Sequence, residues 1–153
     1  MIKKISILFI LFCVIGLFSC KKKAKQQVDD PIADVSMNFN IDPNLPLYAN
    51  LKYATGWIYI NDQGVNGIII YRITDTNTSS DFVAIERTSV YYPNNPKARA
   101  IVQADNFTLK DTISGSTWRI IDGAVLGGPA SSDLRKYNAY YNSSTGILNI
   151  RSY

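Results

Sequence analysis

The chain contains no histidine, and its only two cysteines, Cys13 and Cys20, both lie near the N-terminus. Without histidine the protein has no imidazole general base and no imidazole metal ligand, and no cysteine is left for a disulfide inside the rest of the chain. Charged residues make up only 18% of the 153 residues, whereas 46% are hydrophobic. This composition predicts one globular domain with a packed core.

The N-terminus has the pattern of an export signal. Lys3 and Lys4 precede an almost unbroken apolar run over residues 5–18, which is too short for an ordinary membrane-spanning helix. A buried N-terminal helix is the alternative, but it fits poorly because four lysines follow within residues 21–25. Residues 17–20, Leu-Phe-Ser-Cys, resemble the lipobox of bacterial lipoproteins.

This resemblance implies a signal peptide over residues 1–19 and a lipidated Cys20 as the first residue of the mature chain. Lipidation of the thiol and the new amino group, with palmitate among the acyl chains, would exceed the two signals that stable anchoring needs. Cys13 would leave with the signal, so no free thiol would remain for redox chemistry. We therefore expect a membrane-anchored protein of the bacterial cell envelope.

The basic character of the chain lies in its N-terminal part. Of the 16 basic residues, two precede Cys20 and four lie within residues 21–25, so ten remain against 12 acidic residues. Nucleic-acid binding therefore has no support from composition. The four lysines can contact anionic head groups or form a solvated linker, and residues 20–46 as a whole are predicted to be a polar tether.

The lysines also bear on location. Surface-export signals of Bacteroidetes lipoproteins favour acidic residues directly after the lipidated cysteine, whereas lysines occupy residues 21–23 here. By this resemblance we expect an outer-membrane lipoprotein that faces the periplasm.

Residues 47–153 show the pattern of a single all-β domain with about nine or ten strands. Short β-branched and aromatic runs alternate with turn signals, and no stretch keeps a helical period for three turns. The predicted strands are residues 57–60, 67–73, 82–85, 100–104, 107–109, 117–121, 124–126, 137–141 and 147–150.

Several spaced features resemble one family. Residues 66–72 and 82–93 are similar to the strand pair and first cluster loop of Rieske-type [2Fe–2S] domains, and Ser114-Gly115-Ser116-Thr117-Trp118 is similar to the second loop. Residues 122–137 resemble the closing pattern of the family, and residues 146–150 its last strand. The resemblance implies a Rieske-like multi-sheet antiparallel β domain; an immunoglobulin-like β-sandwich is the alternative.

The cluster ligands of that family are missing. A Rieske centre needs two thiolates and two imidazoles, one of each from each loop. Where the family has Cys-x-His, this chain has Ser89 and Tyr91, and where the family has Cys-x-x-His, it has Asp111 and Ser114. We therefore expect no iron–sulfur cluster, no metal and no other cofactor.

Other chemistries find no clear residues in the vacated site. Asp111 alone is a poor cage for a hard cation, and Ser89 has no visible base to activate it as a nucleophile. Glu86 and the scattered aspartates do not form a pair with the spacing of a glycosidase, and no phosphate-binding Gly-Lys-Ser/Thr loop is present. We therefore expect a protein that is not an enzyme.

The predicted function is that of a binding or structural module, because loops on a rigid scaffold usually carry recognition. An envelope protein or a glycan is the expected partner, and Asp111-Thr112-Ile113 resembles an O-glycosylation motif of Bacteroidetes envelopes. The alternative is a lipid-tethered carbohydrate-binding protein or hydrolase that uses its tyrosine pairs. The expected contact residues on the two loops are Tyr91, Tyr92, Gly115 and Ser116.

Overall fold

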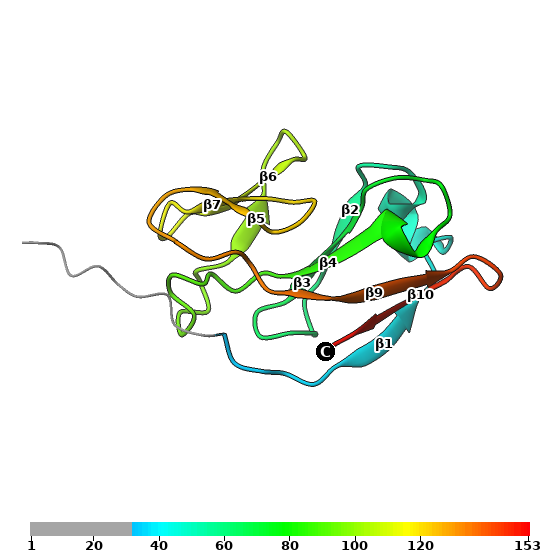
Figure 1. The fold of residues 1–153 in the computed structure, drawn as a ribbon, viewed down its shortest axis with the longest axis horizontal. Helices are drawn as coiled ribbons and strands as arrows, with labels where there is room; N and C mark the ends of the chain where they lie inside the picture. Colours follow the sequence, from blue (N-terminus) through cyan, green and yellow to red (C-terminus); the bar gives the residue numbers. More distant parts are fainter. Residues whose placement is uncertain (1–31) are drawn as a thin grey trace, which may run out of the picture.

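The structure, a computed structural model, describes residues 32–153 (Figure 1). The predicted signal peptide, Cys20 and the first part of the tether lie outside these residues. The described chain is an all-β, multi-sheet antiparallel domain, as the strand pattern predicts. Its elements are β1 (Asn38–Ile41), η2 (Pro46–Lys52), β2 (Trp57–Ile60), β3 (Ile68–Arg72), η3 (Ser79–Asp81), β4 (Phe82–Glu86), β5 (Ala100–Val102), β6 (Thr108–Asp111), β7 (Thr117–Arg119), β8 (Val125–Gly127), β9 (Lys136–Asn142) and β10 (Ile147–Arg151).

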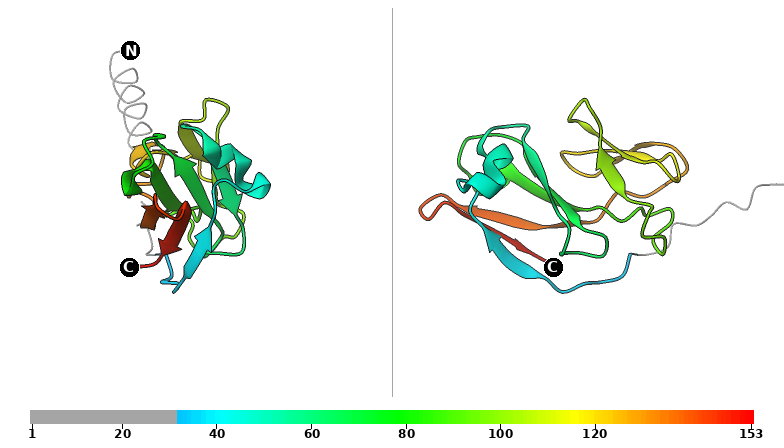
Figure 2. Two further views of the ribbon diagram at one scale, coloured as in Figure 1. Left: turned by 90° about the vertical axis from the view of Figure 1, so that its right-hand side faces the viewer. Right: turned by 180° about the vertical axis from the view of Figure 1, so that it is seen from behind.

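The strands form two antiparallel sheets. A six-stranded sheet has the order β1-β10-β9-β4-β3-β2, and a four-stranded sheet has the order β5-β6-β7-β8. The larger sheet curls at β9, because Lys136 and Tyr137 pair with β4 whereas residues 138–142 pair with β10. Strands β1, β10 and β9 consequently lie below β3 and β4 in the views of Figures 1 and 2.

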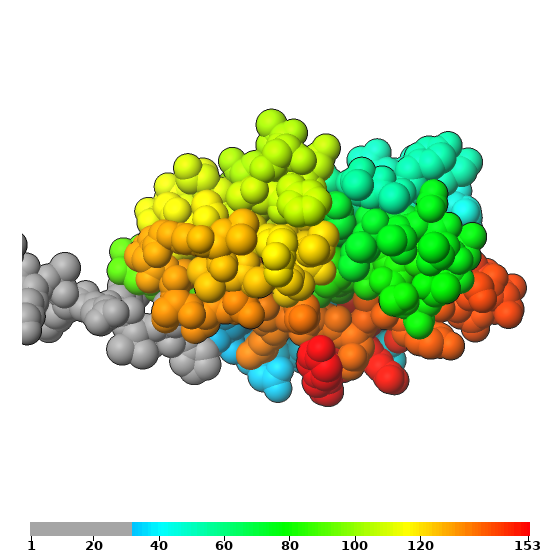
Figure 3. All heavy atoms as spheres, turned by 45° about the horizontal axis from the view of Figure 1, so that its top comes forward, coloured from blue at the N-terminus to red at the C-terminus, as the bar shows by residue number. Residues whose placement is uncertain are grey.

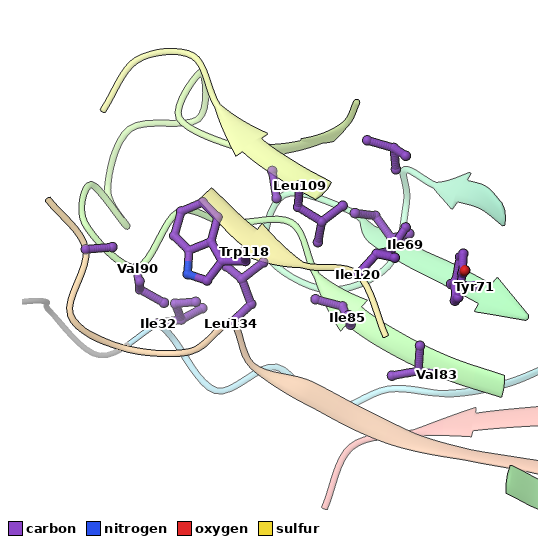
Figure 4. Close-up of a cluster of buried hydrophobic side chains, with 13 residues drawn as sticks. Ile32, Ile69, Tyr71, Val83, Ile85, Val90, Leu109, Trp118, Ile120 and Leu134 are labelled. Atoms are coloured by element: carbon purple, nitrogen blue, oxygen red, sulfur yellow. The ribbon is translucent and has the colours of Figure 1, made fainter. Parts of the chain in front are cut away.

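Strands β3 and β4 separate two hydrophobic cores. All residues of both strands are buried, and successive side chains of a strand point to opposite faces. Ile69 and Ile85 belong to one core, which they share with Leu109 and Trp118 of the smaller sheet (Figure 4). Ile68, by contrast, belongs to the second core, which Leu148 and Ile150 of β10 complete with other residues of the curled sheet. The unbroken apolar run of β3 is therefore a strand covered on both sides.

The folded part begins earlier than predicted. Residues 38–41, inside the predicted tether, form β1, and all four of them pair with residues 148–151 of β10. Ile32 is buried in the first core, where the Arg135 guanidinium donates to its carbonyl oxygen at 2.6 Å. Part of the predicted tether, within residues 32–46, therefore belongs to the folded domain. The described residues include no helix with the length and apolar character that crossing a membrane requires.

A buried carboxylate joins three segments of the domain. Glu86, at the end of β4, is fully buried. One of its oxygens, Oε2, accepts from Val65 N at 2.9 Å and Tyr137 Oη at 2.7 Å. The other, Oε1, accepts from Asn66 N at 3.1 Å and from the backbone N and side-chain Oγ1 of Thr88 at 3.0 and 2.6 Å. These donors replace the water that a buried carboxylate loses.

The Tyr137 phenol remains a hydrogen-bond donor to Glu86 because its pKa is raised. Burial, and then its hydrogen bond to the Glu86 carboxylate, raise the pKa of Tyr137 above the ordinary tyrosine value. The phenol therefore stays protonated and keeps donating to Glu86 over the whole neutral range.

Replacing this carboxylate should destabilise the domain. In a Glu86→Gln variant, an amide NH₂ takes the place of one acceptor oxygen and faces at least two buried donors. We expect the free energy of unfolding in urea to fall by about 3 kcal/mol. A Tyr137→Phe variant removes a single donor and should cost about 1 kcal/mol. Equal stabilities of the Glu86→Gln variant and the native chain would contradict this role.

Candidate functional site

The β4–β5 loop, residues 87–99, contains Ser89 and Tyr91, two of the positions that the resemblance to Rieske domains singled out. It starts as a narrow return, because Thr88 bridges to Arg99 and Ser89 N donates to Ala98 O at 3.0 Å. Val90, which follows directly, is buried in the core. This pairing holds the base of the loop in the interior of the domain.

The Ser89 hydroxyl is buried without a hydrogen-bond partner. It is the one side-chain nitrogen or oxygen in the buried part of residues 32–153 for which no partner exists. A buried hydroxyl without a partner costs about 1–3 kcal/mol. Ser89 therefore keeps a polar group where the surrounding structure makes no use of it.

Tyr91 and Tyr92 form an aromatic pair at the turn of the same loop. Their ring centroids lie 4.6 Å apart with an interplanar angle of 74°, the edge-to-face arrangement that aromatic rings favour. Both side chains are half-buried, and Tyr91 packs against the core beside the smaller sheet. Each predicted contact tyrosine thus presents only part of its ring to solvent.

The β6–β7 loop, residues 112–116, folds around the Asp111 carboxylate. Asp111 is fully buried at the end of β6. Its Oδ1 accepts from Ile113 N at 2.9 Å, and its Oδ2 accepts from Ser114 Oγ at 2.6 Å and Ser114 N at 3.3 Å. Both oxygens are thus engaged by the loop itself, which makes Asp111 a cap for this turn.

Serine hydroxyls connect this loop to the segment between β8 and β9. The hydroxyl oxygens of Ser114 and Ser116 lie 3.0 Å apart, and Ala130 N donates to Ser116 Oγ at 3.1 Å. Gly128 approaches the same loop so closely that a Cβ atom there would lie 2.5 Å from Ser116 Cα. Side-chain size at Gly128 is therefore limited by direct backbone contact with the loop.

The two loops lie at the same end of the domain (Figure 1). Val90 of the first loop shares a core cluster with Trp118 of β7 and with Ala130 and Leu134 of the segment between β8 and β9 (Figure 4). Of the predicted positions, Asp111 and Ser114 join one hydrogen-bonded network, which also includes the predicted contact residue Ser116. Ser89 and Tyr91 belong to the neighbouring loop, and Gly115 lies exposed between the two serines.

The hydrogen bonds of Asp111 limit what this carboxylate can do in the present conformation. The Asp111 carboxylate is occupied by its own loop, so it is not available as a base or as a ligand without reorganisation. Within residues 32–153, no three His, Cys, Asp or Glu side chains gather closely enough to hold a metal ion. Thr112 and Ile113, in contrast, are exposed at the tip of the second loop.

Comparison with known proteins identifies no family for this chain. The sequence matches no protein-family model, and a search of curated proteins gives no significant match.

The two buried serines should respond oppositely to removal of their hydroxyls. A Ser89→Ala variant loses only an unpartnered group, so we expect its free energy of unfolding to rise by about 1 kcal/mol. A Ser116→Ala variant leaves Ala130 N without an acceptor and should lose about 1–3 kcal/mol. Urea unfolding of both variants tests this, and a destabilised Ser89→Ala variant would show that the hydroxyl has a partner.

Proposed function

We propose that this chain is a lipid-anchored lipoprotein of the bacterial cell envelope whose β domain is a Rieske-like scaffold without its cluster. In this proposal the domain acts as a binding or structural module, not as an enzyme, and the lipid at Cys20 holds it at the periplasmic face of the outer membrane. The two loops that hold the cluster in Rieske domains form its contact surface.

One observation carries the Rieske-like part of the proposal. The two segments that resemble the cluster loops in sequence are the β4–β5 and β6–β7 loops, and both emerge at the same end of the domain. This placement favours a Rieske-like arrangement over an immunoglobulin-like sandwich. In a Rieske-like arrangement, the four ligand positions would be those of Ser89, Tyr91, Asp111 and Ser114.

The β6–β7 loop supports a contact function, because its own hydrogen bonds hold it together without a metal. Asp111 and the two serines hold the second loop in one conformation through hydrogen bonds. Ile113 is 50% exposed at its tip. An apolar side chain on a fixed loop can bind a partner without a large ordering cost.

The lipid anchor is tested by exchanging each cysteine. A Cys20→Ala variant should leave the membrane fraction of cells and lose incorporation of labelled palmitate, because it lacks the acylated residue. A Cys13→Ala variant is the matched control and should stay bound, since Cys13 belongs to the predicted signal peptide. Membrane association of the Cys20→Ala variant would refute the anchor.

The Rieske-like scaffold is tested by restoring the ligands. A chain with Ser89→Cys, Tyr91→His, Asp111→Cys and Ser114→His should bind about two irons after reconstitution with iron and sulfide, and should gain visible absorption. The native chain, treated identically, should take up none. The control for nonspecific iron binding is a triple variant that carries the other three changes and retains Ser89. This variant should show a much weaker visible spectrum.

A double variant with two of these four changes offers a test that needs no metal. If the two loops are related as in a Rieske domain, the cysteines of a Ser89→Cys, Asp111→Cys double variant lie close enough to form a disulfide on oxidation. A folded double variant that stays reduced, together with a folded quadruple variant that binds no cluster, would overturn the Rieske-like assignment.

A further inference from the structure

A groove away from the two loops lies between segments far apart in the sequence. Residues 49, 50 and 53–57, from η2 to the start of β2, form one side, and Asn106 in the β5–β6 turn forms the other. Figure 3 shows the yellow-green β5–β6 region beside the cyan-green η2 region on the upper side of the molecule. The groove encloses about 500 Å³, a size within the range of small-molecule sites.

The wall of the groove is fixed by Trp57. Its Nε1 donates to Asn106 Oδ1 at 3.0 Å, which ties β2 to the β5–β6 turn. The Trp57 ring lies 4.8 Å from the ring of Tyr59 and packs against the first hydrophobic core. The indole is therefore held in place before any ligand arrives.

The backbone around the groove is unusual. Three non-glycine residues have positive φ among residues 32–153, and two of them, Thr55 at 66° and Asn106 at 55°, line this groove. Such conformations are uncommon, and they persist only where surrounding contacts hold them. They occur most often at functional sites. Asn50 O also comes so near Gly56 that a Cβ atom there would lie 1.6 Å away.

The chemistry of the lining selects an uncharged ligand. The groove combines two aromatic rings, Tyr53 and Trp57, with the amides of Asn50 and Asn106 and the hydroxyl of Thr55, and no acidic or basic side chain lines it. The neighbouring groove beside η2 includes Asp62, and that at the C-terminus includes Arg135. A phosphate or carboxylate ligand would meet no charge on the lining side chains themselves, and the Lys52 ammonium lies beside the lining, 5.9 Å from the Tyr53 ring centroid.

We propose that this groove binds a neutral oligosaccharide. The C–H faces of a sugar ring are apolar and pack on aromatic rings. The Tyr53 side chain offers such a ring, because it is 66% exposed. The Lys52 ammonium lies 5.9 Å from the centroid of this ring and leaves it exposed to that extent. Sugar hydroxyls both donate and accept hydrogen bonds, as do the two amides and the Thr55 hydroxyl. The proposal uses no residue of the β4–β5 or β6–β7 loop, so it stands or falls independently of the Rieske-like assignment.

The two tryptophans of the chain make binding observable. Trp118 is fully buried in the core, whereas Trp57 lines the groove. The full-length protein is titrated with a panel of neutral oligosaccharides of glucose, mannose and xylose, and with oligogalacturonate as an anionic comparison. At least one neutral oligosaccharide should change the tryptophan emission at saturable concentrations, and oligogalacturonate should not.

Paired variants locate the site. Tyr53→Ala should weaken binding about tenfold, because an exposed stacking ring is lost while the core is untouched. Asn106→Gly removes the side-chain amide, while glycine still allows the positive φ at this position. This variant should also bind more weakly. Tyr140→Ala, on β9, removes a tyrosine that is 58% exposed and lines no part of this groove, and should bind like the native chain.

The outcomes decide the proposal. Saturable binding of a neutral oligosaccharide that Tyr53→Ala weakens and Tyr140→Ala does not would support it. No response to any neutral oligosaccharide, an equal or stronger response to oligogalacturonate, or equal losses in the Tyr53→Ala and Tyr140→Ala variants would overturn it. Circular dichroism of each variant confirms that a loss of binding is not a loss of fold.

Discussion

The arrangement of this domain depends on one buried carboxylate. Glu86 has no water to solvate it, so it draws its hydrogen bonds from the β2–β3 turn, from Thr88 and from Tyr137. These three segments are distant in sequence, and the requirement that all of them satisfy one charge fixes how they meet. Because Thr88 precedes Ser89 directly, the same charge also fixes the point at which the first loop leaves β4.

The two loops are held in place by different contacts. In the second loop, a carboxylate and two serines connect the turn to itself and to Ala130. In the first loop, a strand-like bridge and the buried Val90 serve the same purpose. The Ser89 hydroxyl stands apart from both arrangements, since it is buried and no neighbour bonds to it.

The strands were predictable because most of them carry their signal locally. The apolar run of β3 and the alternating residues of β10 need no knowledge of their partners. Strand β1 was missed because Asn38-Phe39-Asn40-Ile41 lies in a polar, proline-containing stretch and becomes a strand only beside β10. The Glu86 network and the groove at Trp57 were missed for a similar reason: their members meet only in three dimensions. The loops that carry Ser89 and Asp111, in contrast, could be recognised as loops in advance because the strands on either side are marked locally in the sequence.

The buried position of Ile32 limits where the domain can stand on a membrane. This residue packs beside Val90 and Leu134, at the end of the domain that carries both loops (Figure 4). Ile32 follows Cys20 by twelve positions, and a chain of that length reaches at most about 40 Å. With a lipid at Cys20, as proposed, this end of the domain would stay within that distance of the membrane. The loops at this end would then be the part of the domain whose distance from the membrane the short segment limits most directly.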